Sequence, residues 1–271
     1  MILQDTTWVI TGASAGIGAA LAQVAAQEGA TQLFLVARRL PELEKLSDKL
    51  TGQYPQLSVH CLQVDLLIPG ERTQLVMDVY QQAQVDVWVN NAGMGGNGCF
   101  DNLKTSTVLE MVRLNVEALS DLTSQVVQRM KPRKRGAILQ VGSVAGLMPL
   151  PTMGLYAATK AFVLSLTDSL RGELTGTGIT IHSLNPAPVK TEFLEVANRK
   201  GSLNRNQVAV AQSAEAVSKA AIRGLRLNLA HIYPWLGWPF PMIAWLVPRF
   251  VWRWMGKPVA LFSRRQSVTK S

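Results

Sequence analysis

A tyrosine and a lysine four residues apart, with a serine upstream, are the residues of this chain best suited to chemistry. Tyr156 and Lys160 share one face of a predicted helix, and Ser143 precedes the tyrosine by thirteen residues. An ammonium group beside a phenol favours the phenolate, so the pair predicts a tyrosine pKa below its usual value of about 10. Such a phenol could exchange a proton near neutral pH while the serine hydroxyl holds a substrate oxygen. Solvated helix faces carry the same spacing by chance, so the surrounding elements must show whether the pair is catalytic or merely exposed.

The composition indicates one large α/β domain or two small ones. The chain has 271 residues, 48% of them hydrophobic, which is enough to bury a sizeable core. Cys61 and Cys99 lie far apart without a Cys-x-x-Cys spacing. This argues against a disulfide framework or a zinc site and favours a reducing compartment. The first residues lack a basic segment followed by an apolar one, so we expect no signal peptide and a cytoplasmic protein.

The net charge of +9 originates in one end of the chain. Residues 1–215 carry 18 basic and 18 acidic side chains, whereas residues 216–271 carry 9 basic side chains and no acidic one. The body is therefore neutral and the last segment is basic. The overall charge alone does not indicate a nucleic-acid-binding protein.

Short apolar runs alternate with helical patterns through residues 1–215. We expect strands at 7–10, 33–36, 57–64, 85–89, 137–141 and 179–184, and helices at 17–28, 41–50, 71–82, 107–130 and 156–173. Unbroken apolar strands between helices are typical of a parallel sheet covered on both faces. The sequence therefore predicts a Rossmann-type doubly wound α/β domain over residues 1–226. Residues 227–271 would form an apolar C-terminal extension.

The turn between the first strand and the first helix is rich in glycine. It reads Thr-Gly-Ala-Ser-Ala-Gly-Ile-Gly over residues 11–18. In a doubly wound sheet this turn binds dinucleotides, because small residues let the backbone approach the pyrophosphate and the helix N-terminus offers N–H groups to an anion. The candidate contacts are Gly12, Ser14, Ala15, Gly16, Ile17 and Gly18. A tight structural turn is the alternative, and the flanking strand and helix favour the nucleotide site.

The end of the second strand bears on the choice of dinucleotide. NAD-dependent dehydrogenases place an acidic residue there for the ribose 2′-hydroxyl, whereas basic residues accommodate a 2′-phosphate. In this chain Arg38 and Arg39 follow the strand, and the acid is missing. We therefore expect NADP(H) and a bias toward reduction, with Ser14 as a further donor to the phosphate. Arg38 is the better candidate, because Arg39 could simply face solvent.

Taken together, these motifs resemble the short-chain dehydrogenase/reductase family over about residues 5–195. In chain order they are the glycine turn, Asp65, Asn90-Asn91-Ala92-Gly93, Asn115, Ser143, Tyr156 with Lys160, and Pro186 to Thr191. The resemblance implies that Tyr156 is the general acid of carbonyl reduction, while Lys160 lowers its pKa and binds the nicotinamide ribose. It also implies that Ser143 holds the substrate oxygen. Asn115 would position a water that links Lys160 to solvent, although both it and Ser143 also admit structural roles.

The resemblance implies further cofactor contacts beside the adenosine. Asp65 matches the family position that contacts the adenine amino group. Asn91 and Gly93 would shape the loop beside the adenine ribose, with Asn91 the more structural of the two.

Contacts on the nicotinamide side are implied at Pro186, Val189 and Thr191. Val189 would meet the carboxamide through its backbone, and Thr191 could donate to the pyrophosphate or the carboxamide. The family usually has a glycine after the proline, where this chain has Ala187. A positive φ there would strain an alanine, so we expect a slightly different backbone path. The polar residues 194–212 correspond to the substrate lid of the family.

The C-terminal extension departs from an ordinary core. Residues 234–255 hold five of the seven tryptophans and four prolines, and residues 227–248 carry no formal charge. The prolines argue against one continuous membrane-spanning helix. Interleaved tryptophan and arginine suit a membrane interface, and the acid-free end adds attraction to anionic lipid. A lid over the substrate cleft and a subunit interface are the two rivals, whereas RNA binding fits less well because tryptophan and leucine dominate over lysine.

The leading hypothesis is an NADPH-dependent reductase that converts a ketone or aldehyde to an alcohol. The apolar extension suggests a lipophilic substrate, such as an oxoacyl or steroid-like ketone, and peripheral contact with the inner face of a membrane. The resemblance further implies a homodimer or homotetramer. The alternative is a catalytically idle NADP(H)-binding sensor or scaffold, which the presence of Tyr156, Lys160 and Ser143 disfavours. We expect no metal site and no nucleic-acid partner.

Overall fold

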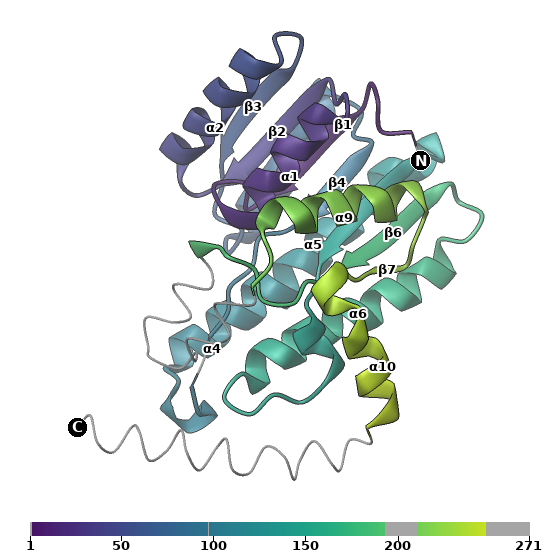
Figure 1. Ribbon diagram of the computed structural model, residues 1–271. Coiled ribbons are helices and arrows are strands. Elements are labelled where there is room, and N and C mark those ends of the chain that lie inside the picture. Colours follow the sequence, from purple (N-terminus) through teal and green to yellow (C-terminus); the bar gives the residue numbers. More distant parts are fainter. Residues whose placement is uncertain (1, 97, 193–210, 248–271) are drawn as a thin grey trace.

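Parallel strands form one continuous sheet. The computed structural model describes residues 2–96, 98–192 and 211–247 (Figure 1). Within them the strands are β1 (Thr7–Thr11), β2 (Gln32–Ala37), β3 (Ser58–Gln63), β4 (Val87–Asn90), β5 (Gly136–Val141), β6 (Ile179–Leu184) and β7 (His231–Ile232). Their spatial order is β3-β2-β1-β4-β5-β6-β7, and every neighbouring pair is parallel. The direction of strand addition reverses between β1 and β4, which confirms the predicted doubly wound sheet.

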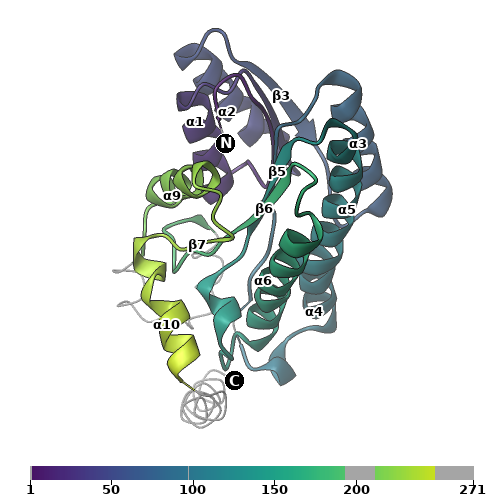
Figure 2. The same ribbon diagram turned by 90° about the vertical axis from the view of Figure 1, so that its right-hand side faces the viewer.

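Helices cover both faces of the sheet, as Figure 2 shows. One face carries α1 (Gly16–Gln27), α2 (Leu40–Gln53) and α9 (Ala214–Arg226), and the other carries α3 (Pro69–Gln82), α5 (Leu119–Met130) and α6 (Gly154–Glu173). Along β1, Trp8 and Ile10 belong to the first hydrophobic cluster and Val9 to the second. Successive strand residues point to opposite faces, so one short apolar strand supplies both cores.

The predicted elements are present, one of them is interrupted, and two further elements were not predicted. The helix expected over 107–130 is divided into α4 (Thr105–Val112) and α5 by a π-helical turn, Arg113–Ala118. The sequence reading missed α9 and β7, both of which follow the polar segment 194–212. β7 has two residues, too few for a sequence pattern to reveal.

The short edge strand β7 is held by a chain of side chains from three elements. The Asp168 carboxylate on α6 contacts His231 Nε2 at 2.7 Å, and His231 Nδ1 lies 2.6 Å from Ser183 Oγ on β6. Ser183 is fully buried, so this Ser-His-Asp arrangement fastens a strand and offers no accessible nucleophile. The expected boundary at residue 226 falls between α9 and β7, so the chain beyond it contributes to the sheet.

A buried polar network ties the centre of the sheet to α5. Asn90, at the end of β4, accepts a bond from Trp88 Nε1 at 2.8 Å and donates to Thr123 Oγ1 at 3.0 Å and to Gln140 Oε1 at 3.1 Å. Gln140 also donates to Thr123 at 2.9 Å. Because all four side chains are almost fully buried, each bond satisfies a group that has no access to water. The network therefore fixes the end of β4, from which the next loop leaves.

Replacement of Asn90 by alanine is expected to lower the free energy of unfolding by about 2–4 kcal/mol, because Trp88 Nε1 and Gln140 Oε1 would lose their partner while buried. Urea denaturation measures the change. Asn102→Ala, at an exposed asparagine, is the matched control and should change stability by less than about 0.5 kcal/mol. Equal effects of the two substitutions would contradict a stabilising role for the network.

Candidate active site

The glycine turn after β1 is braced against the loop that follows β4. Gly12 has φ +67°, and a Cβ there would lie 2.9 Å from the Ala92 Cα, so glycine is required for both its conformation and its space. Thr11 Oγ1 accepts bonds from the backbone N–H of Asn91 at 3.0 Å and of Ala92 at 3.1 Å. Asn91 Nδ2 in turn donates to the carbonyls of Thr11 and Gly12 at 2.9 and 3.1 Å. These bonds give Asn91 a structural contact with the turn.

The N-terminus of α1 is suited to bind an anion. Its N-cap residue Ala15 makes no side-chain capping bond, and within the described residues no side chain caps the first helical N–H groups at Gly16, Ile17 and Gly18. Thr191 approaches from the other side of the sheet edge, since a Cβ at Gly16 would lie 3.1 Å from its methyl group. The residues present therefore fit the pyrophosphate of a dinucleotide, in the place that the sequence predicts.

The structure brings the candidate catalytic residues together beyond the end of β5. Ser143 is the N-cap of a short 3₁₀ turn, Val144–Leu147, and its Oγ accepts a bond from the Ala145 N–H at 3.1 Å. Tyr156 and Lys160 lie in the first turns of α6, and all three side chains are buried. The turn packs closely on α6 at Gly146, where a Cβ would lie 2.6 Å from the Lys160 carbonyl carbon. That close approach sets the distance between serine and tyrosine.

Asn115 lies in the π-helical turn and is almost fully buried. Its Oδ1 accepts from the Met94 N–H at 2.9 Å, and its Nδ2 donates to the Met94 carbonyl at 2.8 Å and to Thr159 Oγ1 at 3.1 Å. Thr159 donates to the Tyr156 carbonyl at 2.8 Å, which joins Asn115 to the catalytic helix. A π turn widens the helix locally and is frequent at functional sites. A water relay through Asn115 stays a prediction.

Gly93 lies beside Asn115 and Lys160, and its expected place next to the adenine ribose stays a prediction. A Cβ at this position would be 3.2 Å from Asn115 Oδ1 and 3.7 Å from Lys160 Nζ. A Cβ here would crowd the asparagine oxygen, whereas its distance from the ammonium group is that of an ordinary contact. The absence of a side chain therefore leaves room for Asn115.

Burial shifts the two central pKa values in opposite directions. Desolvation raises the pKa of Tyr156 to about 12, although the hydrogen bond with Ser143 acts to lower it. Desolvation lowers the pKa of Lys160 to about 8. The expected lowering of the tyrosine pKa is therefore wrong for this state of the protein. The Lys160 ammonium lies 5.8 Å from the tyrosine ring centroid and donates instead to the Val141 carbonyl at 2.7 Å.

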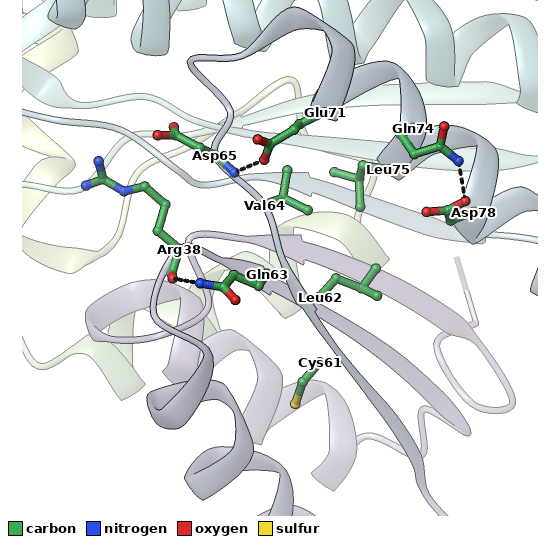
Figure 3. Close-up of a pocket in the computed structure, with 10 residues that line it drawn as sticks. All are labelled: Arg38, Cys61, Leu62, Gln63, Val64, Asp65, Glu71, Gln74, Leu75 and Asp78. Carbon is green, nitrogen blue, oxygen red and sulfur yellow. Dashed lines mark hydrogen bonds between the residues drawn. The ribbon is translucent and has the colours of Figure 1, made fainter.

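The two arginines after β2 point to different places. Arg38 borders a cavity of about 610 Å³ at the ends of β2 and β3, together with Asp65 (Figure 3). Asp65 Oδ1 accepts a bond from the Leu67 N–H at 3.0 Å. Arg39 donates from Nε and Nη2 to Ser14 Oγ in the glycine turn, at 3.3 and 3.1 Å. Arg39 is half exposed, yet it contacts the cofactor turn, whereas the sequence reading favoured Arg38 and left Arg39 to the solvent.

The loop after β6 runs along the other side of the predicted cofactor site. The Pro186 carbonyl accepts from the Val144 N–H at 3.2 Å, next to Ser143. Val189 is buried and bridges to Gln212, while the Thr191 hydroxyl donates to the Val189 carbonyl at 3.3 Å.

The backbone at Ala187 and the region beyond the loop bear on two further expectations. Ala187 is not among the residues with positive φ, so alanine is accommodated without backbone strain. Of the expected lid, residues 194–210 lie outside the described part of the chain.

Thr11, Thr159, Met94 and Glu192 take part in the site, and sequence reasoning missed them. Thr11 belongs to the recognised glycine turn and Thr159 precedes Lys160, so their position was the available signal. Met94 acts through its backbone, which leaves no trace in residue type. Glu192 pairs with Arg39 at 3.0 Å across 153 residues of sequence, a contact that only the fold creates. In the described residues no cluster of histidine, cysteine or acidic side chains could hold a metal.

Replacement of Lys160 by methionine is expected to stabilise the protein below pH 8. Wild-type Lys160 titrates near 8 when folded and near 10.5 when unfolded, so burial of its charge lowers the free energy of unfolding by at most about 3 kcal/mol. Loss of the bond to Val141 offsets part of the gain. The advantage of Lys160→Met should be about 1–2 kcal/mol near pH 7 and should vanish as the pH rises from 8 to 10.5.

Urea denaturation of both proteins across this pH range measures the difference. Lys104→Met, at an exposed lysine, is the control and should alter stability by less than about 0.5 kcal/mol at every pH. A Lys160→Met variant that is less stable than the wild type near pH 7 would contradict a desolvated lysine.

Comparison with known proteins places this geometry in a family. The model of the short chain dehydrogenase family matches residues 6–202. A short-chain dehydrogenase from Sphingobium yanoikuyae, solved with NADPH, is 31% identical, with a TM-score of 0.79 over 98% of this chain and 95% of that one. An NADP-dependent 3-hydroxy acid dehydrogenase from Schizosaccharomyces pombe is 33% identical over 70% of this chain and 74% of its own length.

A further relative extends the comparison to a lipid enzyme. The very-long-chain 3-oxoacyl-CoA reductase of Aspergillus terreus is 32% identical over 76% of this chain, a stretch that covers 58% of the relative. Each of these matches therefore extends over more than two thirds of this chain. By this evidence the protein is an oxidoreductase that belongs to the short-chain dehydrogenase/reductase family.

Proposed function

We propose that this protein uses NADPH to reduce a lipophilic ketone or aldehyde to the alcohol. The observation that carries the proposal is the burial of the Tyr156 and Ser143 hydroxyls together, with Lys160 one helix turn beyond Tyr156 and the glycine turn on the same edge of the sheet. A carbonyl oxygen held by both hydroxyls would face a cofactor bound along that edge.

The roles of the residues follow from their chemistry. NADPH, when bound, supplies a hydride to the carbonyl carbon. Tyr156, with a pKa raised to about 12, holds its proton at neutral pH and can give it to the developing alkoxide. Ser143 donates a hydrogen bond to the same oxygen and stabilises its growing negative charge. Lys160 and Asn115 would return a proton to the tyrosine through the water that the asparagine positions.

NADP(H) is the cofactor that the basic residues favour. Arg39 already contacts Ser14 in the glycine turn, and Arg38 borders the neighbouring cavity, so two guanidinium groups flank the expected place of a 2′-phosphate. The Sphingobium relative binds NADPH, and the fission-yeast relative is NADP-dependent. Both names support the same cofactor for this chain.

An apolar cavity at the N-terminal end of α6, the helix that carries Tyr156, supports a lipophilic substrate. It measures about 230 Å³, and its lining includes Phe100, Leu103, Met153 and Leu155, the residue before Tyr156. Most of its walls are carbon side chains, glycine or proline, which favour an alkyl chain over a polar group. An oxoacyl compound is the substrate class that agrees best with this lining. By name, one relative is a 3-hydroxy acid dehydrogenase and another is a very-long-chain 3-oxoacyl-CoA reductase.

The C-terminal extension carries an exposed surface of tryptophan. A 3₁₀ turn, Trp235–Gly237, leads to α10 (Pro239–Leu246), which lies beyond β7 at the edge of the molecule (Figure 2). Trp235, Trp238 and Trp245 are 87%, 70% and 83% exposed. Of the described residues, none forms a helix long and apolar enough to cross a bilayer.

We propose that this tryptophan surface contacts the headgroup region of an anionic membrane. Indole rings favour that depth. Residues 216–271 carry nine basic side chains and no acidic one, which favours a negatively charged leaflet. The opposite side of the same segment packs toward the active site, since a Cβ at Gly237 would lie 3.3 Å from the side chain of Val144. One segment could thus contact lipid and border the site.

Replacement of Tyr156 by phenylalanine should lower kcat for NADPH-dependent ketone reduction by about 10²–10⁴-fold, because the general acid is lost. NADPH oxidation with medium-chain 3-oxoacyl substrates measures the effect, and NADPH affinity should stay close to that of the wild type. Tyr80→Phe removes a buried hydroxyl on α3 that has no hydrogen-bond partner among the described residues, and it should leave kcat unchanged. Retention of turnover in Tyr156→Phe would refute the proposed mechanism.

Replacement of Trp235, Trp238 and Trp245 by serine is expected to reduce binding to anionic vesicles by roughly tenfold, because the interfacial side chains are lost. Co-sedimentation of the full chain with phosphatidylserine-containing vesicles measures binding. Phe100→Ser, at another exposed aromatic residue, is the control and should bind as the wild type does. If the wild type does not bind vesicles and the triple variant dissociates into monomers, the surface is a subunit interface and the membrane proposal fails.

A further inference from the structure

An internal anion already occupies Arg39, one of the two arginines expected to bind the cofactor phosphate. Arg39 Nη2 lies 3.0 Å from Glu192 Oε2 and 3.1 Å from Ser14 Oγ. Nη2 therefore contacts both a carboxylate and a hydroxyl, and Nε donates to the same hydroxyl at 3.3 Å. Both charged side chains are about half exposed, at 49% and 59%, so a solute can reach them.

This ion pair spans the predicted cofactor site. Ser14 belongs to the glycine turn after β1, whereas Glu192 follows directly on Thr191, which packs against Gly16. The two loops are thus in contact at the expected pyrophosphate position. The Arg39–Glu192 pair links the same two loops a second time, nearer the surface. The pair stands on the same side as Ser14, where the 2′-phosphate is expected.

A carboxylate and a phosphate compete for the same guanidinium donors. Arginine presents its N–H groups in a planar fork that either anion can accept, and two anions crowded on one edge repel each other. NADPH would therefore have to displace the Glu192 carboxylate or share Arg39 with it. NADH carries a neutral hydroxyl at this position and can bind while the ion pair persists.

Building on the proposed cofactor, we propose that Glu192 competes with the 2′-phosphate of NADPH for Arg39 and thereby sets the affinity margin between NADPH and NADH. Glu192 is a specificity-determining residue that acts through Arg39. Its carboxylate weakens NADPH binding and leaves NADH binding unaffected. The interaction between Arg39 and the phosphate is strongest when the carboxylate charge at position 192 is removed.

The size of the effect follows from the exposure of the pair. An exposed arginine–carboxylate pair contributes less than about 1 kcal/mol, which corresponds to at most a fivefold change in an equilibrium constant. Replacement of Glu192 by glutamine should therefore tighten NADPH binding by about two- to fivefold. The change should shrink as ionic strength rises, because salt screens an exposed pair.

A double-mutant cycle tests the inference by titration of nicotinamide fluorescence at low salt. The wild type, Glu192→Gln, Arg39→Met and the double variant are each titrated with NADPH and with NADH. We expect Glu192→Gln to tighten NADPH binding in the wild-type background and to have no effect when Arg39 is methionine. Glu215→Gln, which removes the same charge from the exposed Lys219 pair on α9, is the control and should change neither affinity.

The outcomes separate this inference from the proposed cofactor. If Glu192→Gln leaves NADPH affinity unchanged, or if it tightens NADPH equally in the Arg39→Met background, competition for Arg39 is overturned. If the wild type binds NADH but not NADPH, the proposed cofactor itself fails. The competition is supported if Glu192→Gln tightens NADPH binding only when Arg39 is present and NADH affinity stays constant in all four proteins.

Discussion

The hydrogen bond from the buried Lys160 ammonium to the Val141 carbonyl is the contact on which the active site depends. Val141 is the last residue of β5, and Ser143 follows two positions later. Because Lys160 lies one turn beyond Tyr156, this bond fastens the catalytic helix to the strand that carries the serine. A charged group in a dry interior requires such a partner, so desolvation makes the contact obligatory. The constraint that lowers the lysine pKa also fixes the geometry.

Buried polar groups organise the rest of the site in the same way. Asn115 satisfies its amide with the backbone of Met94 and the hydroxyl of Thr159, and it thereby joins the loop after β4 to α6. Asn90 holds the start of that loop through its own buried network. Each amide has several partners on different elements, so small displacements of one element would leave groups unsatisfied. The carboxyl edge of the sheet is therefore rigid where chemistry is expected.

Much of the outer cofactor region depends instead on exposed charges. Arg39, Ser14 and Glu192 meet at the surface, where solvent and salt weaken each interaction. Weak contacts can be exchanged for a ligand at little cost, which suits a region that must admit and release a large cofactor. The segment of the 3₁₀ turn and α10 shows a similar division, with Gly237 packed near Val144 and the tryptophan side chains exposed.

The sequence by itself determined the features that depend on neighbouring residues. The Tyr156–Lys160 spacing, the glycine turn and the alternation of strands and helices are local, and backbone geometry converts them directly into structure. The fold was therefore predictable in class and in most elements. The two-residue strand β7 escaped because so short a segment has no periodicity, and the interruption of the long helix escaped because residue type does not reveal a π turn.

Tertiary structure alone decided how the groups act on one another. The pairing of Arg39 with Glu192, the contacts of Asn115 with Met94, and the place of Gly93 beside Lys160 all depend on which strands are neighbours. The pKa of Tyr156 shows the same limit: the i, i+4 lysine predicted a decrease, and burial produced an increase. Desolvation and long-range pairing depend on what the whole fold places around a residue, which its local sequence does not contain.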